Sequence, residues 1–87
     1  MFNNIPYYMS KKEKRLEQLK VNPTSLSYKE IESLFDSEMY DIERGKWSHK
    51  LIFHKDSWQY VSIPIHGWDC KGYYKSVLKN FYIVTNQ

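Results

Sequence analysis

Cysteine is almost absent from this sequence, which contains Cys70 and no other. A framework of intramolecular disulfides is therefore excluded, and we expect a protein of a reducing compartment. Long apolar runs are lacking too, since no stretch approaches the roughly 20 residues that a membrane-spanning helix needs. The first four residues have neither the basic nor the apolar region of a signal peptide. Together these absences predict a cytoplasmic protein that does not span a membrane.

An excess of charge of one sign is also lacking. Thirteen Lys and Arg residues against ten Asp and Glu residues give a net charge of +3, which favours a polyanionic partner only mildly. Aromatic residues, by contrast, make up 17% of the 87 residues and include eight tyrosines. This content is enough for the compact core of one domain. Some tyrosines must reach the surface, where they can serve a protein interface or stack on bases.

The N-terminal residues 1–22 are predicted to form a helical arm that precedes the main domain. Ser10 can cap a charged helix over residues 11–20. Pro23 ends this helix, because the residue before a proline is driven out of the helical conformation. The basic residues of the arm could contact phosphate, but a run of charge is more commonly a solvated face.

The remaining residues, 23–87, are predicted to form one domain that begins and ends with a helix. Ser27 and Glu30 have the spacing of a capping box, so the first of these helices should run from there to about residue 36. The last helix follows Asp69, which is its expected cap.

Alternating residues between these helices indicate strands over residues 38–43, 47–55 and 60–66. The third strand should lie at an edge, because Pro64 cannot donate to a neighbouring strand. Short turns between the strands favour an antiparallel meander. The predicted fold class is α+β, in the order α-β-β-β-α, with a three-stranded antiparallel sheet covered on one face by two helices. This is the topology of a double-stranded-RNA-binding domain.

Residues 44–54 hold the best candidates for chemistry. There, a glycine turn flanked by Arg44 and Lys46 leads into a strand that opens with Ser48 and His49. Histidine is the side chain whose ordinary titration lies nearest neutral pH, so the stretch is typical of proton transfer beside an anion. From spacing alone, a buried histidine bonded to a backbone carbonyl is the more common explanation of His49.

Strand parity separates the two histidines of this stretch. His49 shares a face with Leu51 and Phe53, at the end of an apolar stripe, whereas His54 shares the opposite face with Ile52. The pair is therefore not expected to act as acid and base from one strand. We predict a structural or turn role for His54.

A set of motifs extends over about residues 21–82, most of the chain. It consists of the helix over residues 27–35, the Ser48-His49 pair, His54, the run Ser62-Ile63-Pro64-Ile65-His66, and the run Lys71-Gly72-Tyr73-Tyr74-Lys75-Ser76-Val77-Leu78. In combination these motifs resemble the HicA family of bacterial toxins.

The resemblance implies an mRNA interferase of a type II toxin–antitoxin system, with a fold similar to a double-stranded-RNA-binding domain. Such an endoribonuclease cleaves messenger RNA without a metal or other cofactor, and a HicB-like antitoxin neutralises it. The family's essential histidine belongs to a Gly-Ser-His motif, which implies that His49 is the catalytic residue here. It would act as a general acid or base on the ribose 2′-hydroxyl or the leaving 5′-oxygen.

Trp47 departs from this motif, because it stands where the family has glycine. The backbone freedom of that glycine would be lost or supplied by Gly45, and the indole could stack on a base. Other candidate RNA contacts lie near His49 and on a basic row that Lys71, Lys75 and Lys79 would form along the last helix. The predicted RNA-binding residues are Arg44, Lys46, Trp47, Ser48, Lys50, Lys71 and Lys75.

Other functions compete with this prediction. A non-catalytic RNA-binding module would use the basic row and surface aromatics, and a protein-interaction subunit would use the tyrosines. The order His49, His54, His66, Cys70 crudely mimics a zinc site, but strand parity separates the first two, and no metal is predicted. Cys70 is not favoured as a nucleophile, because a cysteine at the start of a helix is as easily a small, partly buried residue.

Overall fold

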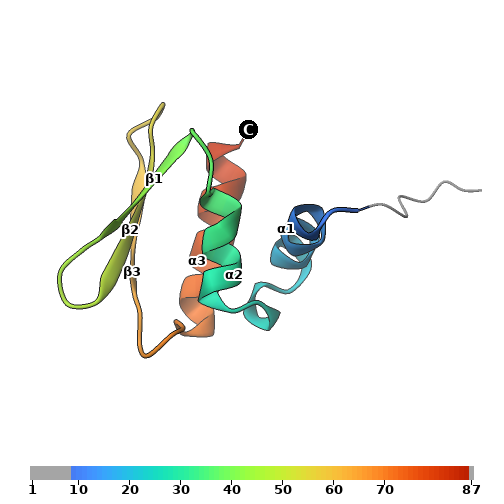
Figure 1. The fold of residues 1–87 in the computed structure, drawn as a ribbon, viewed down its shortest axis with the longest axis horizontal. Helices are drawn as coiled ribbons and strands as arrows, with labels where there is room; N and C mark the ends of the chain where they lie inside the picture. The colour runs from blue at the N-terminus through green and yellow to red at the C-terminus, as the bar shows by residue number, and fades with distance from the viewer. Residues whose placement is uncertain (1–8, 87) are drawn as a thin grey trace, which may run out of the picture.

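The computed structural model describes residues 9–86, which form a small sheet with helices on one side of it (Figure 1). The helices are α1 (Lys11–Val21), α2 (Tyr28–Glu32) and α3 (Gly72–Thr85), with short 3₁₀ turns η1 (Pro23–Ser25) and η2 (Ser33–Phe35) on either side of α2. The strands are β1 (Tyr40–Arg44), β2 (His49–His54) and β3 (Tyr60–Pro64). The predicted arm corresponds to α1, and its residues 1–8 lie outside the described part of the chain.

The sheet is antiparallel, with β2 in the centre and β1 and β3 at the edges. In Figure 1, α2 and α3 lie side by side over one face of the sheet, and α1 lies beyond them, away from the sheet. The predicted α+β class, with the order α-β-β-β-α after an additional helix, is therefore confirmed. The edge position predicted from Pro64 is also confirmed, whereas the likeness to a double-stranded-RNA-binding domain stays a prediction.

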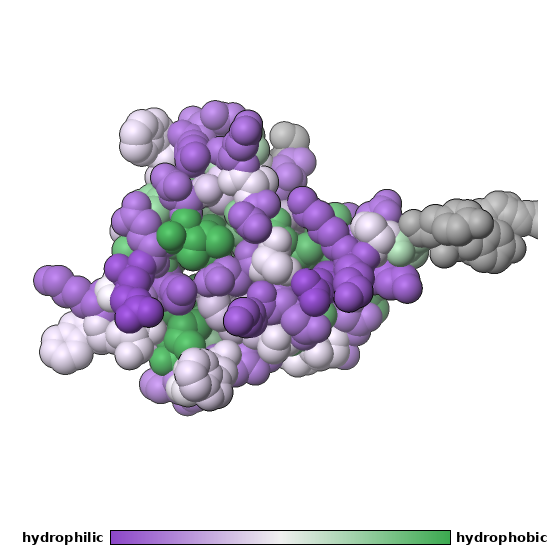
Figure 2. Space-filling model, in the orientation of Figure 1, coloured by the Kyte–Doolittle hydropathy of each residue, from purple (hydrophilic) through white to green (hydrophobic). Residues whose placement is uncertain are grey.

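One apolar cluster holds the layers together. Its fully buried members include Ile52 from the sheet, Phe35 and Leu78 from the helix side, and Leu19 from α1. Figure 2 shows a mostly hydrophilic surface, with hydrophobic residues visible in small patches between the sheet and the helix pair. Within residues 9–86, no helix is both long enough and apolar enough to cross a membrane.

The helices cover the face of β2 that carries Ile52 and His54, both of which are buried. Leu51 and Phe53 lie on the open face and are half-buried. The predicted grouping of side chains is thus confirmed, and the apolar stripe that begins at His49 belongs to the open face. Cross-strand pairing explains this choice, because the partners of Ile52 on β1 and β3 are apolar residues that pack against the core.

Side-chain caps start both N-terminal helices. At α2, Ser27 Oγ accepts a hydrogen bond from the Glu30 amide, and the Glu30 carboxylate accepts one from the Ser27 amide. This is the predicted capping box, and α1 has the same arrangement with Ser10 and Glu13. The helix predicted to reach residue 36 changes to a 3₁₀ turn after Glu32.

Candidate active site

A cleft of about 520 Å³ opens where β1 ends, β2 begins and β3 leads towards α3. Figure 1 shows the turn after β1 and the loop after β3 at the same lower end of the sheet. The residues that line the cleft come from several elements and include Tyr28 and Glu32 of α2, Arg44 of β1, His49 of β2 and Trp68 of the loop. The predicted catalytic histidine therefore lies in a concave site that separate parts of the chain create.

The turn before β2 orients the ring of His49. Nδ1 lies 2.8 Å from the carbonyl oxygen of Lys46 and 3.2 Å from that of Trp47. A carbonyl oxygen only accepts hydrogen bonds, so we assign the ring hydrogen to Nδ1, which leaves the lone pair of the neutral ring on Nε2. The side chain is half-buried rather than enclosed. His49 can therefore act as a base through Nε2.

Two residues of this turn adopt the left-handed backbone conformation, Trp47 with φ 58° and Ser48 with φ 65°. Hydrogen bonds from the Gly45 amide to the His49 carbonyl (2.7 Å) and from the His49 amide to the Lys46 carbonyl (3.0 Å) close the turn. Left-handed backbone costs a non-glycine residue roughly 1–2 kcal/mol. The turn that holds the candidate catalyst is therefore strained.

Gly45 does not supply the conformational freedom expected of it. Positive φ among the glycines of residues 9–86 occurs at Gly67 alone. A Cβ atom on Gly45 would lie 3.3 Å from the side chain of Leu51, so glycine allows the turn to approach the sheet closely. Of the two alternatives for the backbone freedom of the family's glycine, its transfer to Gly45 is therefore excluded, because the positive φ lies at Trp47 itself.

The predicted cations near His49 are held in different ways. Arg44 is exposed, lines the cleft and is the cross-strand partner of Lys50. Lys50 Nζ lies 3.6 Å from a carboxylate oxygen of Glu32, whereas Lys46 is exposed on the turn. Ser48 is exposed and also lines the cleft. The fold thus brings the predicted residues of this stretch to one end of the sheet.

Sequence reasoning missed several residues of the cleft, among them Tyr28 and Glu32. The Tyr28 hydroxyl donates a 2.7 Å hydrogen bond to the carboxylate that pairs with Lys50. Burial, followed by this bond to Glu32, raises the pKa of Tyr28, so the phenol keeps its proton and remains a donor at neutral pH. Tyr28 and Glu32 are four positions apart in the helix that follows the Ser27 cap, so they lie on one helical face. This spacing could have predicted that the two side chains lie together.

No known protein family, curated protein or solved structure matches this chain. The resemblance to HicA therefore rests on the residues of the sequence and stays a prediction.

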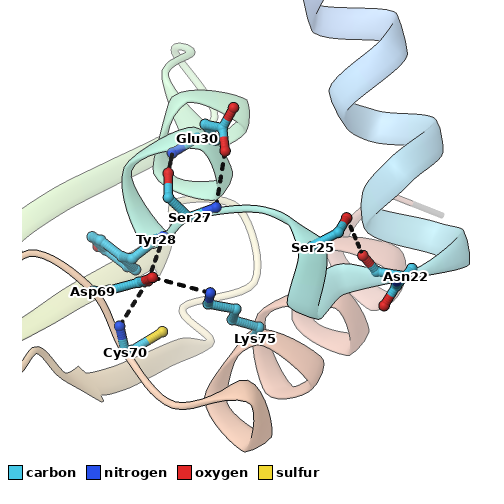
Figure 3. Close-up of polar contacts among 8 residues, drawn as sticks. All are labelled: Asn22, Ser25, Ser27, Tyr28, Glu30, Asp69, Cys70 and Lys75. Atoms are coloured by element: carbon cyan, nitrogen blue, oxygen red, sulfur yellow. Dashed lines mark hydrogen bonds and ion pairs between the residues drawn. The ribbon is translucent and has the colours of Figure 1, made fainter.

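Asp69 joins the segments beside the cleft (Figure 3). Its carboxylate accepts hydrogen bonds from the amides of Tyr28 (2.7 Å) and Cys70 (2.8 Å) and from Lys75 Nζ (3.2 Å). Burial alone would raise the pKa of Asp69, but these bonds from Cys70, Tyr28 and Lys75 outweigh it and lower the pKa. Asp69 thereby ties the start of α2 to the loop that carries Trp68.

These contacts correct two predictions about the last helix. Asp69 is not its cap, because the N-cap residue of α3 is Lys71, with no side-chain hydrogen bond. The predicted basic row is also wrong, because the Lys75 side chain is 9% exposed and bound to Asp69, which makes it unavailable to RNA. Lys71 is exposed but does not line the cleft. Burial and the Asp69 carboxylate raise the pKa of Cys70, so its thiol stays protonated.

The other two histidines do not join His49. His54 is buried, and its Nδ1 lies 2.7 Å from the hydroxyl of Ser57 in the following turn, which confirms its predicted structural role. His66 is exposed, and its backbone pairs with that of Asp69. Within the described residues 9–86, no group of three or more His, Cys, Asp or Glu side chains is arranged to hold a metal ion.

Proposed function

We propose that this protein is an endoribonuclease that cleaves messenger RNA, with His49 as its acid–base group and without a metal. One observation carries this proposal. Nδ1 of His49 is bound to the Lys46 carbonyl, so that Nε2 is the basic nitrogen of a half-buried ring in a cleft. Arg44 and Lys50 line the same cleft and would supply the positive charge that a phosphate requires, Lys50 after leaving its ion pair with Glu32.

In the proposed reaction, Nε2 of His49 takes the proton of a ribose 2′-hydroxyl, and the freed oxygen attacks the adjacent phosphorus. The bond between phosphorus and the 5′-oxygen breaks, and that oxygen takes up a proton from the imidazolium. The products are a 2′,3′-cyclic phosphate and a 5′-hydroxyl, and His49 returns to its neutral form. Arg44 and Lys50 stabilise the negative charge that develops on the other phosphate oxygens.

The resemblance to HicA extends the proposal to a toxin that acts in the cytoplasm and is neutralised by a HicB-like antitoxin. The backbone of Trp47 supports this extension, because the position of the family's glycine has φ 58°, which glycine adopts without strain. The antitoxin is expected to cover the cleft or its cations. Expression of the chain alone should arrest growth, and co-expression of a HicB-like protein encoded beside it should restore growth.

Incubation of the purified protein with labelled RNA in EDTA tests the proposed chemistry. We expect cleavage that leaves 2′,3′-cyclic phosphate ends, and a rate about 10²- to 10⁴-fold lower for His49→Ala. His66→Ala is the matched control, because His66 is an exposed histidine on the neighbouring loop and its backbone contacts do not require the ring. Cleavage by His49→Ala at the wild-type rate would exclude His49. Binding without cleavage by the wild type would instead identify a non-catalytic RNA-binding module.

A further inference from the structure

All three tryptophans of the chain are almost fully exposed. The exposed fractions are 87% for Trp47, 84% for Trp58 and 92% for Trp68. Indole is a large apolar ring that proteins ordinarily bury for the most part, and leaving it in water forgoes hydrophobic free energy. Aromatic rings placed in this way are typical of surfaces that contact a ligand.

One of these rings lines the cleft, a second belongs to the turn beside it, and the third lies elsewhere. Trp68 lines the cleft, and Trp47 belongs to the turn whose carbonyl oxygens hold the ring of His49. Trp58 follows β2, in a turn that Figure 1 shows at the opposite end of the sheet. A function of the cleft can therefore use Trp47 and Trp68 but not Trp58.

Backbone hydrogen bonds hold both cleft-side rings on closed turns. Trp68 lies between His66 and Asp69, whose amides and carbonyls pair at 2.8 and 3.2 Å. The next amide upstream, that of Ile65, donates a 3.1 Å hydrogen bond to the Ser48 carbonyl in the turn after β1. The two turns are thus joined to each other, so a ligand that contacts both rings orders little additional backbone.

The charges near these two rings favour a polyanion. Lys29 and Arg44 line the cleft, and Lys46 is exposed beside Trp47. At the other end of the sheet, Lys55 is paired with Asp41 at 3.8 Å. A ligand that offers flat apolar rings and regularly spaced negative charges to the cleft is a strand of nucleic acid.

We propose that Trp47 and Trp68 each stack on an unpaired base of a single-stranded RNA whose phosphate lies at His49. This inference rests on the proposed function, because that function makes RNA the ligand. In a duplex, neighbouring base pairs cover both faces of each base, so neither indole can stack on it. The substrate is therefore a single-stranded segment with bases free on both sides of the scissile phosphate, and helical stems are left uncut.

Binding of a labelled single-stranded RNA of roughly 12 nucleotides tests this inference. The protein carries His49→Ala, so that the RNA stays intact during the measurement. Adding Trp47→Ala or Trp68→Ala should weaken binding about 5- to 100-fold. Trp58→Ala is the matched control, because Trp58 is exposed to nearly the same extent as Trp47 and has a similar φ of 62°, and it should leave binding unchanged. The same strand annealed to its complement should bind more weakly and respond to neither substitution.

Several outcomes would overturn the inference. One is an equal loss of RNA affinity in all three alanine variants, and another is no loss of affinity on substitution of Trp47 and Trp68. Tight binding of the duplex, or binding of a protein through both rings without binding of RNA, would also contradict it. Trp68→Phe should retain binding and Trp68→Leu should lose it, because leucine is apolar but has no flat ring. The EDTA assay tests the nuclease separately. If RNA binds through the two tryptophans but is not cleaved, the proposed nuclease activity is excluded and the stacking is retained. If RNA is cleaved at the same rate with and without Trp47 and Trp68, the stacking is excluded and the nuclease activity is retained.

Discussion

The two turns that flank β2 are built from the same kinds of residue, yet their histidines differ in what they can do. Each turn contains a tryptophan in the left-handed conformation, Trp47 with φ 58° and Trp58 with φ 62°. Each also adjoins a histidine at one end of β2. His49 is half-buried, with Nδ1 held by backbone carbonyl oxygens, whereas His54 is buried and bonded to the hydroxyl of Ser57.

Strand geometry and neighbouring segments cause this difference. Residues 49 and 54 are an odd number of positions apart, so their side chains point to opposite faces of the sheet. The helix pair covers the side of His54, whereas His49 lies at the other end of β2, where residues of α2 and of the loop after β3 line an open cleft with it. A histidine of this strand is chemically accessible only where other segments surround it without enclosing it.

Alanine substitutions at His49 and His54 should show the largest difference between the two turns. His49→Ala removes the proposed acid–base group and should reduce cleavage about 10²- to 10⁴-fold, with little change in the free energy of unfolding. His54→Ala leaves a cavity under the helices and should lower the free energy of unfolding by about 2 kcal/mol, with cleavage per folded molecule unchanged. Urea unfolding and the EDTA assay measure the two effects. Loss of cleavage without loss of stability at His54 would contradict the comparison.

Asp69→Asn should weaken the hydrogen bonds that tie the start of α2 to the loop carrying Trp68. The loss of charge-assisted hydrogen bonds at a half-exposed carboxylate is expected to cost about 1–2 kcal/mol at pH 7. The folded-state pKa of Asp69 is lowered, so its contribution is present above the unfolded value of about 3.9 and is lost as pH falls through the folded value. The stability difference between wild type and variant should therefore shrink below about pH 4.

Asp41→Asn is the matched control for this measurement. Asp41 pairs with Lys55 at 3.8 Å, but its side chain is 59% exposed, so its loss should change the free energy of unfolding by less than about 0.5 kcal/mol. A stability difference for Asp69→Asn that stays constant from pH 7 down to acid unfolding would show that the carboxylate charge is not what holds the loop.

Glycine substitutions at the two strained tryptophans should change stability less than His54→Ala does, and in the opposite direction. Trp47→Gly and Trp58→Gly should each raise the free energy of unfolding by about 0.5–1 kcal/mol, because the strain relieved exceeds the entropy that glycine loses. Only Trp47→Gly should also weaken binding of single-stranded RNA. Thermal melting and the binding assay compare the two variants directly, and destabilisation by both would mean that the rings pack against the protein in solution.

Much of the fold could be predicted because the relevant residues are near each other in sequence. The capping box of Ser27 and Glu30, the alternation in β2 and the edge strand with Pro64 each depend on a few neighbouring positions. Asp69 shows why other features could not be predicted, because its carboxylate binds the amide of Tyr28, 41 positions away. The same carboxylate holds Lys75 inward and so removes it from the predicted basic row.

The candidate site divides in the same way. Arg44, Ser48, His49 and Lys50 lie in one short stretch, so the sequence alone indicated them as a group. The rest of the cleft comes from α2 and from the loop that carries Trp68, and only the folded chain brings these segments beside His49. Which face of the sheet the helices cover was likewise not predictable from β2, whose two faces both carry apolar residues.

The packing of α1 has a consequence for how the molecule opens. Leu19 is the buried residue of this charged helix, so few apolar contacts resist its detachment. Helices of this kind unfold locally at low free energy, and their amides exchange with deuterium sooner than those of a helix such as α3, which packs against the sheet. Because α1 lies on the far side of the helix pair from the sheet (Figure 1), such openings leave the cleft intact. We therefore expect α1 to melt and reform without disturbing the cleft around His49.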